Sequence, residues 1–253
     1  MLTVAQSILL GIVQGATEWL PISSSGHLVL LQKLLGVNVP VVYDISLHVG
    51  TLFAALVVFW KDILRIVKSF VQFKRNESFR LGIMVLVASL VTAAIGFSFL
   101  QFFKSLFVNV KAVGIGLILT GAFLVATKFF HGTRKINLFD AVVMGIAQGV
   151  AIAPGVSRSG MTIASGLIRR IDKSSVVKFS FLISIVAVMG AQIVELKNID
   201  FVSVNAAALA AGVASSALAG YISIKFLLKT LLSKKFYLFA IYCFAAGLVV
   251  LLI

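Results

Sequence analysis

Three kinds of reactive side chain stand close together in TEWLPISSSGH, residues 17–27. Glu18 supplies a carboxylate, Ser24 a hydroxyl group and His27 an imidazole. Ser24 and His27 are spaced i, i+3 and share one face of a helix, so the imidazole can reach the hydroxyl or a substrate oxygen. A serine beside a base is the minimal set for nucleophilic transfer. A water molecule activated by His27 or Glu18 is the open alternative to Ser24 as the attacking group.

A second stretch, PGVSRSGMT at 154–162, has the residue types of an anion-binding cradle. Arg158 presents a planar fork that holds phosphate oxygens in pairs. Glycines let backbone N–H groups come close to a ligand, and a helix that begins near Ser159 would add further unpaired N–H groups. The residues predicted to bind substrate are Gln14, Ser23, Ser25, Gly155, Ser157, Ser159, Gly160 and Thr162.

Gln14 and Glu18 are spaced i, i+4 and therefore lie on one helix face. Carboxylate and amide oxygens are ligands for Mg²⁺ or Ca²⁺, and Mg²⁺ takes its other oxygens from water and substrate phosphates. A single carboxylate is too small a set of protein ligands for a permanently bound metal ion. We therefore expect a divalent cation, Mg²⁺ or Ca²⁺, to bind at Glu18 and Gln14 together with a phosphate group.

The chain around these residues is 60% hydrophobic and 12% charged, with a mean hydropathy of +1.12. Runs such as 81–100 are apolar over the length of a spanning helix and do not alternate with period two, which predicts an all-α membrane protein. The formal net charge of +14 would suit nucleic acid, but the basic residues fall between apolar segments, where membrane orientation explains them better. The expected partner is thus the lipid bilayer, with no nucleic acid. Cys243, the one cysteine, lies in an apolar segment and is assigned to packing.

Two regions that are too broken to span, 3–36 and 138–170, are interrupted by Pro, Gly and Ser near their middle. Each broken piece is about half a span long, which predicts two re-entrant helical hairpins. The other apolar segments are long enough for six transmembrane helices. They are 45–66, 80–102, 111–130, 176–195, 204–226 and 236–253.

The two broken regions are related to each other. GIVQGATEWLPISSSG (11–26) aligns without a gap to GIAQGVAIAPGVSRSG (145–160), with seven of sixteen positions identical. Three predicted spans separate the hairpins, so the hairpins enter from opposite faces, as in an inverted-topology repeat. We expect one transmembrane domain, 1–253, made of the inverted repeats 1–130 and 138–253. The alignment places Ser24 at the position of Arg158, and a pseudo-twofold axis would bring these two residues face to face.

Loop charges predict the orientation of the chain. The face that carries both termini has four basic residues, Lys33, Lys104, Lys111 and Lys197, whereas the loops of the opposite face have seventeen. Basic loops stay in the cytoplasm. Both termini and the mouth of the first hairpin are therefore expected outside the cell, with the active site opening to the outer face.

Ionisable groups at membrane depth are costly and count as functional candidates. Glu18 and Arg158 are such groups, although a purely structural ion pair between them is the alternative. Gln148 is expected to make a helix–helix hydrogen bond. His48, four residues after Asp44, is interpreted as part of an interfacial pair, with a place at the cavity mouth as the alternative. The remaining histidine, His131, lies in a basic loop and is expected to be solvated.

GIVQGATEWLPISSSGH together with APGVSRSGMT resembles the two signature motifs of the undecaprenyl-pyrophosphate phosphatase family, which confers bacitracin resistance. The resemblance implies removal of one phosphate from a C55 polyprenyl pyrophosphate, with a divalent cation, to regenerate the lipid carrier of cell-wall synthesis. It also implies six spans and two re-entrant hairpins.

The resemblance assigns roles residue by residue. Gln14 and Glu18 fall on the family's (E/Q)xxxE positions, and Ser24 and His27 fall on its catalytic serine and histidine. In the second motif, phosphate binding falls on Ser157, Arg158 and Thr162. Two positions depart from the usual pattern: Gln14 is Glu in many members, which leaves one carboxylate for a metal, and Trp19 replaces a usual Phe.

A lipid flippase or transporter is the main rival function, because inverted repeats with broken helices are typical of secondary transporters. The clustering of Ser, His, Glu and Arg favours bond cleavage instead. A channel is disfavoured because the sequence has no ring of like charges. The oligomeric state is open, with a homodimer as the assembly considered.

Overall fold

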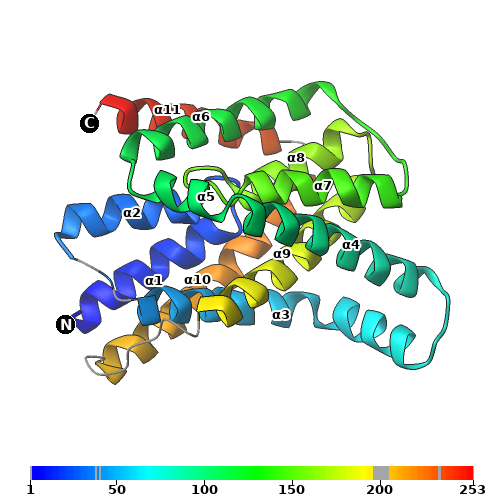
Figure 1. Ribbon diagram of the computed structural model, residues 1–253, viewed down its shortest axis with the longest axis horizontal. Coiled ribbons are helices and arrows are strands. Elements are labelled where there is room, and N and C mark those ends of the chain that lie inside the picture. Colours follow the sequence, from blue (N-terminus) through cyan, green and yellow to red (C-terminus); the bar gives the residue numbers. More distant parts are fainter. Residues whose placement is uncertain (1, 38, 40, 196–204, 233–234, 253) are drawn as a thin grey trace.

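The computed structural model describes residues 2–37, 39, 41–195, 205–232 and 235–252. Within them the fold is all-helical, with eleven α-helices and no strand, only one isolated bridge between Arg134 and Ile171. Figure 1 shows the helices lying alongside one another, with both termini at the same end of the bundle. An all-α fold was predicted, and the structure confirms it.

Five of the described helices are long and apolar enough to cross a membrane. They are α3 (Val41–Val71), α4 (Glu77–Ser98), α6 (Val110–Ala126, continued by η1, Thr127–Phe129), α9 (Lys173–Glu195) and α10 (Ala206–Leu232). The sixth predicted span is a shorter apolar segment, formed by η3 (Phe236–Leu238) and α11 (Phe239–Leu252). Positions 204 and 253 of the predicted spans, and Lys197 of the predicted outer loops, lie outside the described residues.

Three predicted spans differ from the helices by several residues: α3 extends beyond 45–66 at both ends, α10 continues past 226, and α4 ends before 102. In the last case α4 ends at Ser98 and a separate helix, α5 (Leu100–Phe107), follows Phe99. The polar side chains of Gln101 and Lys104 give this stretch a different character from the apolar helix before it, and α5 buries only Phe103. The chain therefore leaves the direction of α4 before it enters α6.

The two broken regions fold as matching helix pairs. The first consists of α1 (Val4–Glu18) and α2 (Ser24–Leu35), the second of α7 (Leu138–Val150) and α8 (Arg158–Ile168). Residues 134 positions apart have the same structural role in the two helix pairs. Thr3 and Asn137 each open their pair with a capping box.

The second helix of each pair is also capped at matching positions. Ser23 accepts a hydrogen bond from the Gly26 amide at 3.4 Å, and Ser157 accepts one from the Gly160 amide at 3.1 Å. A serine at the N-cap satisfies an amide that has no partner within its helix. The S-x-S-G ending shared by the two motifs is therefore a helix start, and its first serine is the capping group.

The correspondence extends to the far ends of the pairs. After α2, Gly36 has a φ of 61°, and after α8, Arg170, 134 positions later, has a φ of 60°. Glycine adopts this left-handed conformation without cost, whereas arginine needs support from its surroundings. Arg170 has that support, since its carbonyl accepts from the Arg134 amide at 3.3 Å. The repeat found in sixteen residues therefore covers both entire helix pairs.

Small residues set the packing of the pairs onto their neighbours. α1 packs on α10, and α7 packs on α4. A Cβ added at Gly11 would lie 2.4 Å from the carbonyl oxygen of Gly212, and one at Gly145 would lie 2.6 Å from that of Ala88. Lipid tails are as apolar as the helices, so close van der Waals contact takes over the role that the hydrophobic effect has in water. The repeated glycines make that contact possible.

Gln148 makes the helix–helix hydrogen bonds that were predicted for it. Its amide nitrogen donates to Thr92 on α4 at 3.2 Å, and its amide oxygen accepts from Ser184 on α9 at 3.3 Å. Cys243 is buried and donates to the Pro21 carbonyl in the break of the first pair, in agreement with its assignment to packing. Both polar groups therefore hold helices together.

Ion pairs with a buried aspartate join the start of α7 to the end of α8 in the second pair. Asp140, at the start of α7, accepts two hydrogen bonds of 2.8 Å from Arg134 and a third bond from Arg169, just after α8. The hydrogen bonds to Asp140 raise the pKa of Arg134, which lies in the loop before α7. Because these groups tie the two ends of the pair together, the break at its centre is held in place.

Candidate active site

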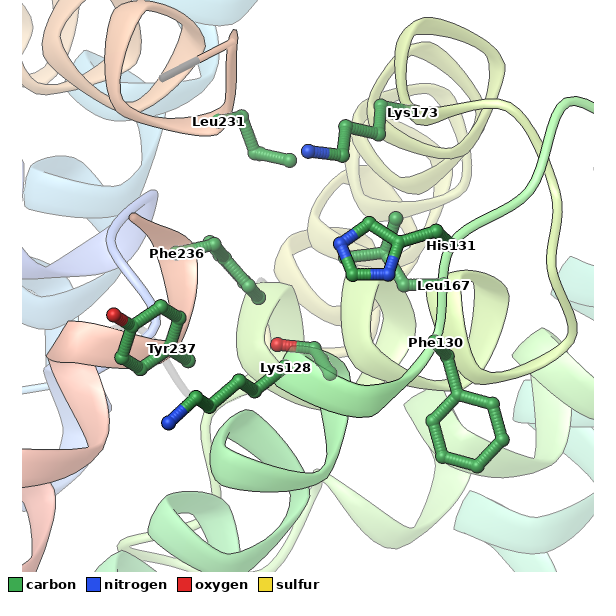
Figure 2. A pocket seen from close by; sticks show the side chains of 9 residues that line it. Lys128, Phe130, His131, Leu167, Lys173, Leu231, Phe236 and Tyr237 are labelled. Carbon is green, nitrogen blue, oxygen red and sulfur yellow. The ribbon is translucent and has the colours of Figure 1, made fainter. Parts of the chain in front are cut away.

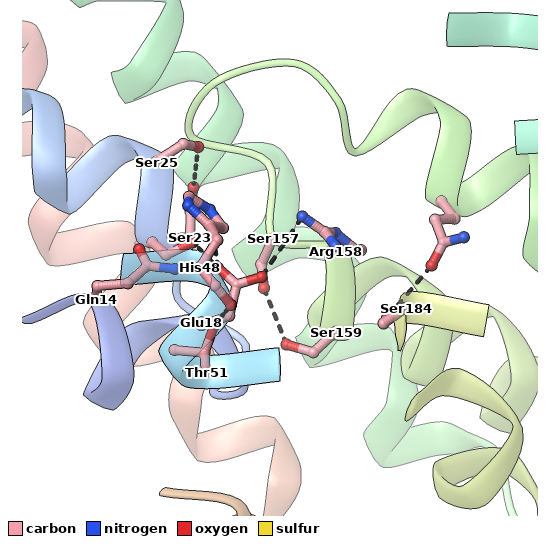
Figure 3. A network of polar contacts seen from close by, with 12 residues as sticks. Gln14, Glu18, Ser23, Ser25, His48, Thr51, Ser157, Arg158, Ser159 and Ser184 are labelled. Carbon is pink, nitrogen blue, oxygen red and sulfur yellow. Dashed lines mark hydrogen bonds and ion pairs between the residues drawn. The ribbon is translucent and has the colours of Figure 1, made fainter. Parts of the chain in front are cut away.

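Glu18 is the centre of the polar network in Figure 3. It is the last residue of α1, and 7% of it is exposed. Trp19, the next residue, is fully buried and stacks on Phe181 of α9 with ring centroids 5.0 Å apart. The large ring anchors the break between α1 and α2, so the carboxylate before it is held against the centre of the bundle.

Ser24 and Arg158 contact opposite oxygens of the Glu18 carboxylate. The Ser24 hydroxyl donates to Oε2 at 2.5 Å, and Nη2 of Arg158 lies 3.5 Å from Oε1. Gln14 also donates to Oε2, at 3.0 Å. The expectation that the repeat brings Ser24 and Arg158 together is confirmed, with the carboxylate between them. In this arrangement Glu18, rather than His27, is the group placed to accept the serine proton.

His48 of α3 joins this network, although the sequence favoured an interfacial pair. Its Nε2 lies 3.8 Å from Oε2 of Glu18. Its Nδ1 lies 2.7 Å from the Asp44 carbonyl, which can only accept, so Nδ1 carries the proton and Nε2 is directed at the carboxylate. The sequence contained a signal for this: His48 lies inside a predicted span, where an ionisable group is a functional candidate.

Two polar atoms beside Glu18 are buried without a hydrogen-bond partner among the described residues: Oε1 of Gln14 and Nη1 of Arg158. An unpaired buried polar atom costs about 1–3 kcal/mol, so such atoms next to a carboxylate favour a ligand. One is an acceptor suited to a cation and the other a donor suited to an anion.

The oxygens at this site fit a hard divalent cation only in part. Glu18 and Gln14 offer oxygen atoms of the kind that Mg²⁺ and Ca²⁺ accept. The described residues, however, contain no group of three His, Cys, Asp or Glu side chains that could hold a metal ion. Any cation here would need further oxygens from water or from a bound phosphate.

The structure does not bring His27 to Ser24 or Glu18. Its Nδ1 lies 2.7 Å from the Ser23 carbonyl, and its Nε2 contacts the hydroxyl of Tyr242 on α11. The rings of His27 and Tyr242 also stack, with centroids 5.6 Å apart. No sequence signal pointed to Tyr242, because the two residues are 215 positions apart.

The second motif contacts the break of the first. The Ser159 hydroxyl donates to the Leu20 carbonyl at 3.0 Å, and the Ser157 hydroxyl does so at 3.4 Å. The paired serines also contact each other at 3.3 Å, as Ser23 and Ser25 do in the first motif. The hydroxyls predicted to bind phosphate thus hold the two breaks against each other.

Thr162 and the two motif glycines lie in packing positions. Thr162 is fully buried and contacts the Ser180 hydroxyl of α9 at 2.5 Å. Gly155 has a φ of 83°, and a Cβ there would lie 2.1 Å from the Val113 carbonyl of α6. The Gly160 amide donates to Ser157. These residues shape the loop that presents Arg158.

Ser23 holds the one strained backbone conformation next to Ser24, with φ 66° and ψ 100°. We expect Ser23→Ala to lower the free energy of unfolding by about 1 kcal/mol more than Ser23→Gly does. Alanine loses the cap and keeps the strain, whereas glycine relieves the strain and costs only a few tenths as a cap. Thermal unfolding in detergent would compare the variants, with the matching pair at Ser157 (φ −80°) as the control. Equal effects of alanine and glycine at Ser23 would contradict this account.

Comparison with known proteins extends these observations to the whole chain. Residues 7–249 match the family model described as bacitracin resistance protein BacA. A protein of Alkaliphilus metalliredigens named undecaprenyl-diphosphatase is 41% identical over 99% of this chain and 98% of its own. Proteins of the same name from Halothermothrix orenii and Korarchaeum cryptofilum are 39% and 37% identical, covering 97% and 98% of this chain and 96% and 98% of their own. With its apolar helices and this match, the chain is a multi-pass membrane protein that belongs to the bacitracin resistance protein BacA family.

Proposed function

We propose that this protein hydrolyses undecaprenyl diphosphate to the monophosphate and inorganic phosphate, recycling a lipid carrier and giving bacitracin resistance. The observation that carries the proposal is the buried Glu18 carboxylate, with Ser24 on one oxygen and Arg158 on the other. A nucleophile, a proton acceptor and a cation for phosphate oxygens meet at one point, in a chain similar over its length to proteins named undecaprenyl-diphosphatase.

The proposed reaction begins when the diphosphate enters beside Glu18. The unpaired Nη1 of Arg158 binds the terminal phosphate, and Ser24 gives its proton to Glu18 as its oxygen attacks the terminal phosphorus. The new Oγ–P bond replaces the bridging P–O bond, and polyprenyl monophosphate leaves. Water then hydrolyses the phosphoserine to release phosphate. Direct attack by water, with Glu18 as base, gives the same products.

A divalent cation would be held by Glu18 and by the unpaired Oε1 of Gln14, with further oxygens from the diphosphate. When bound, it would neutralise charge on the phosphate oxygens. The protein residues keep their roles: Arg158 orients the terminal phosphate, and the buried surroundings of Glu18 exclude bulk water.

Removal of metal is expected to abolish phosphate release from C55 pyrophosphate by the detergent-purified protein. EDTA should lower the rate to background, and excess Mg²⁺ or Ca²⁺ should restore it, because a single carboxylate cannot retain the cation without substrate. Colorimetric phosphate release would measure this. Release that persists in EDTA would remove the metal from the mechanism. No release from folded protein with either metal would contradict the phosphatase proposal and direct attention to lipid-flipping assays.

His48 is proposed as a positioning residue for Glu18. We expect His48→Ala to lower kcat/KM about 10- to 100-fold, as changes of supporting residues around metal ligands do. The metal concentration needed for half-maximal rate should rise, a change that a purely structural role would not produce. His131→Ala, at an exposed histidine, is the matched control. An unchanged metal dependence in His48→Ala would contradict the role.

The membrane topology is also a proposal. Two inverted repeats, 1–130 and 138–253, would place the helix pairs as re-entrant hairpins among six spans, with both termini outside and the site open to the outer face. The common end of the two termini in Figure 1 and the basic loops of the other face support it. Labelling of single cysteines at the termini in intact cells would test it, and a cytoplasmic C-terminus would overturn it. The homodimer stays a prediction.

A further inference from the structure

A cavity lies away from the Glu18 network, between the η1 region, α8, α9 and η3 (Figure 2). Its volume is about 110 Å³. Segments far apart in sequence meet there: η1 and the residues after it, the end of α8, the start of α9, the end of α10, and η3. The lining residues are Thr127, Lys128, Phe130, His131, Leu167, Lys173, Leu231, Phe236 and Tyr237.

The cavity gathers positive charge. Three of its nine lining residues are basic, namely Lys128, His131 and Lys173, and none is acidic. The neighbouring acid, Asp172, is occupied in capping α9, where it accepts from the amide and hydroxyl of Ser175 at 3.0 and 3.1 Å. Concave surfaces with one sign of charge and apolar walls focus the electrostatic potential and attract the opposite charge. The cavity therefore favours an anion.

Most of the remaining lining residues are apolar. Leu167, Leu231 and Phe236 are buried. The ammonium group of Lys128 lies 5.6 Å from the centroid of the Tyr237 ring, a cation–π contact that positions the charge. A volume of about 110 Å³ equals that of roughly four water molecules, which is room for one tetrahedral oxyanion.

Apolar side chains lie exposed beside the cavity. Phe129 on η1 has 73% of its surface exposed. Leu238 on η3 and Ile241 on α11 have 41% and 68% exposed. A lipid whose head group entered the cavity could lay its tails on these side chains. Basic pockets between helices on the cytoplasmic side of membrane proteins bind lipid phosphates in this way.

We propose that this cavity is a phosphate-binding site, separate from Glu18 and Arg158, that takes the phosphate group of an anionic lipid or inorganic phosphate itself. It shares no residue with the hairpin site and lies among the most basic loops of the chain. The inference does not rest on the proposed hydrolysis. A phosphate bound there would lie among basic side chains from the η1 region and the start of α9.

Native mass spectrometry would test the proposal with dioleoyl phosphatidate and with diolein, which has the same chains and no phosphate. All proteins would carry Arg158→Ala, so that the hairpin site does not contribute. We expect phosphatidate to bind in preference to diolein. The change Lys128→Gln with His131→Gln should lower phosphatidate binding about 30-fold, since two basic groups near a membrane surface, at about 1 kcal/mol each, contribute about 2 kcal/mol.

The matched control is Lys68→Gln with Lys74→Gln. These lysines lie in a basic loop on the same predicted face and outside the cavity. A loss in the cavity variant alone supports the site, whereas an equal loss in both, or none in either, overturns it. Lys128→Gln with Lys173→Gln is a second cavity variant if the first fails to fold. Displacement of phosphatidate by millimolar inorganic phosphate would assign the site to the phosphate group alone; resistance would assign it to the lipid ester. In an Arg158-containing background, the cavity variants should keep wild-type phosphate release.

Discussion

Replacing Arg158 with alanine is expected to lower kcat/KM for phosphate release from C55 pyrophosphate by about 10³-fold or more. Arg158 is the one strong cation in contact with the Glu18 carboxylate, and its Nη1 is buried without a partner among the described residues. Arginines that neutralise the charge of the phosphoryl group during its transfer increase kcat by about 10³- to 10⁵-fold. Initial rates over a range of substrate concentrations would separate a loss in kcat from a rise in KM.

Two variants give this prediction its controls. Arg158→Lys keeps the charge but loses the planar fork, so its rate should lie between those of wild type and alanine. Arg170→Ala, at an exposed arginine after α8, should keep wild-type activity. A loss below tenfold in Arg158→Ala would leave the arginine as a structural partner of Glu18. In that case the loss of rate in Arg158→Ala should follow a loss of folded protein, measured by thermal unfolding in detergent; the catalytic role predicts a loss of rate in folded protein.

The sequence predicted the centre of the site well because that centre is built on local and repeated features. Gln14 and Glu18 are one helix turn apart, so their contact follows from helix geometry. Ser24 and Arg158 occupy equivalent positions of the two aligned motifs, and both contact one carboxylate in the structure. The break and its caps follow from Pro, Gly and Ser at defined positions.

Other parts of the site depend on contacts that no local pattern encodes. Tyr242 meets His27 across 215 positions, and His48 reaches Glu18 only because α3 packs beside α1. The spacing of Ser24 and His27 showed that they could meet, yet the imidazole turns to α11 instead. Residue spacing determines which side chains can lie on the same helix face. The helices packed against that face determine which partner each side chain contacts.

Two members of the second motif show that residue type alone does not assign a role. Serine and threonine hydroxyls suit phosphate, but they equally suit backbone carbonyls and one another. The Thr162 hydroxyl bonds to the Arg158 carbonyl at 2.8 Å and to Ser180, so it holds α8 on α9. Gly155 admits α6 next to the loop. Both residues shape the loop and helix that present Arg158, a role that the sequence pattern cannot distinguish from direct contact with phosphate.

Glu18→Gln is expected to lower kcat about 10²- to 10⁴-fold, with the fold intact. The amide has the shape of the carboxylate and can still meet Ser24 and Gln14, but it cannot accept the serine proton. It also removes the charge that would hold the cation, so the metal concentration for half-maximal rate should rise. Glu77→Gln, at an exposed acid paired with Lys135, is the matched control.

The same variant distinguishes the two chemical routes when the terminal phosphate of the substrate carries ³²P. If Ser24 is the nucleophile and Glu18 its base, acid quenching should trap ³²P on wild type, far less on Glu18→Gln and none on Ser24→Ala. If water attacks directly, no protein should be labelled, and Ser24→Ala should retain more activity than Glu18→Gln because the base is still present. Wild-type rates in Glu18→Gln would contradict both routes, since each requires the carboxylate that the structure places between Ser24 and Arg158.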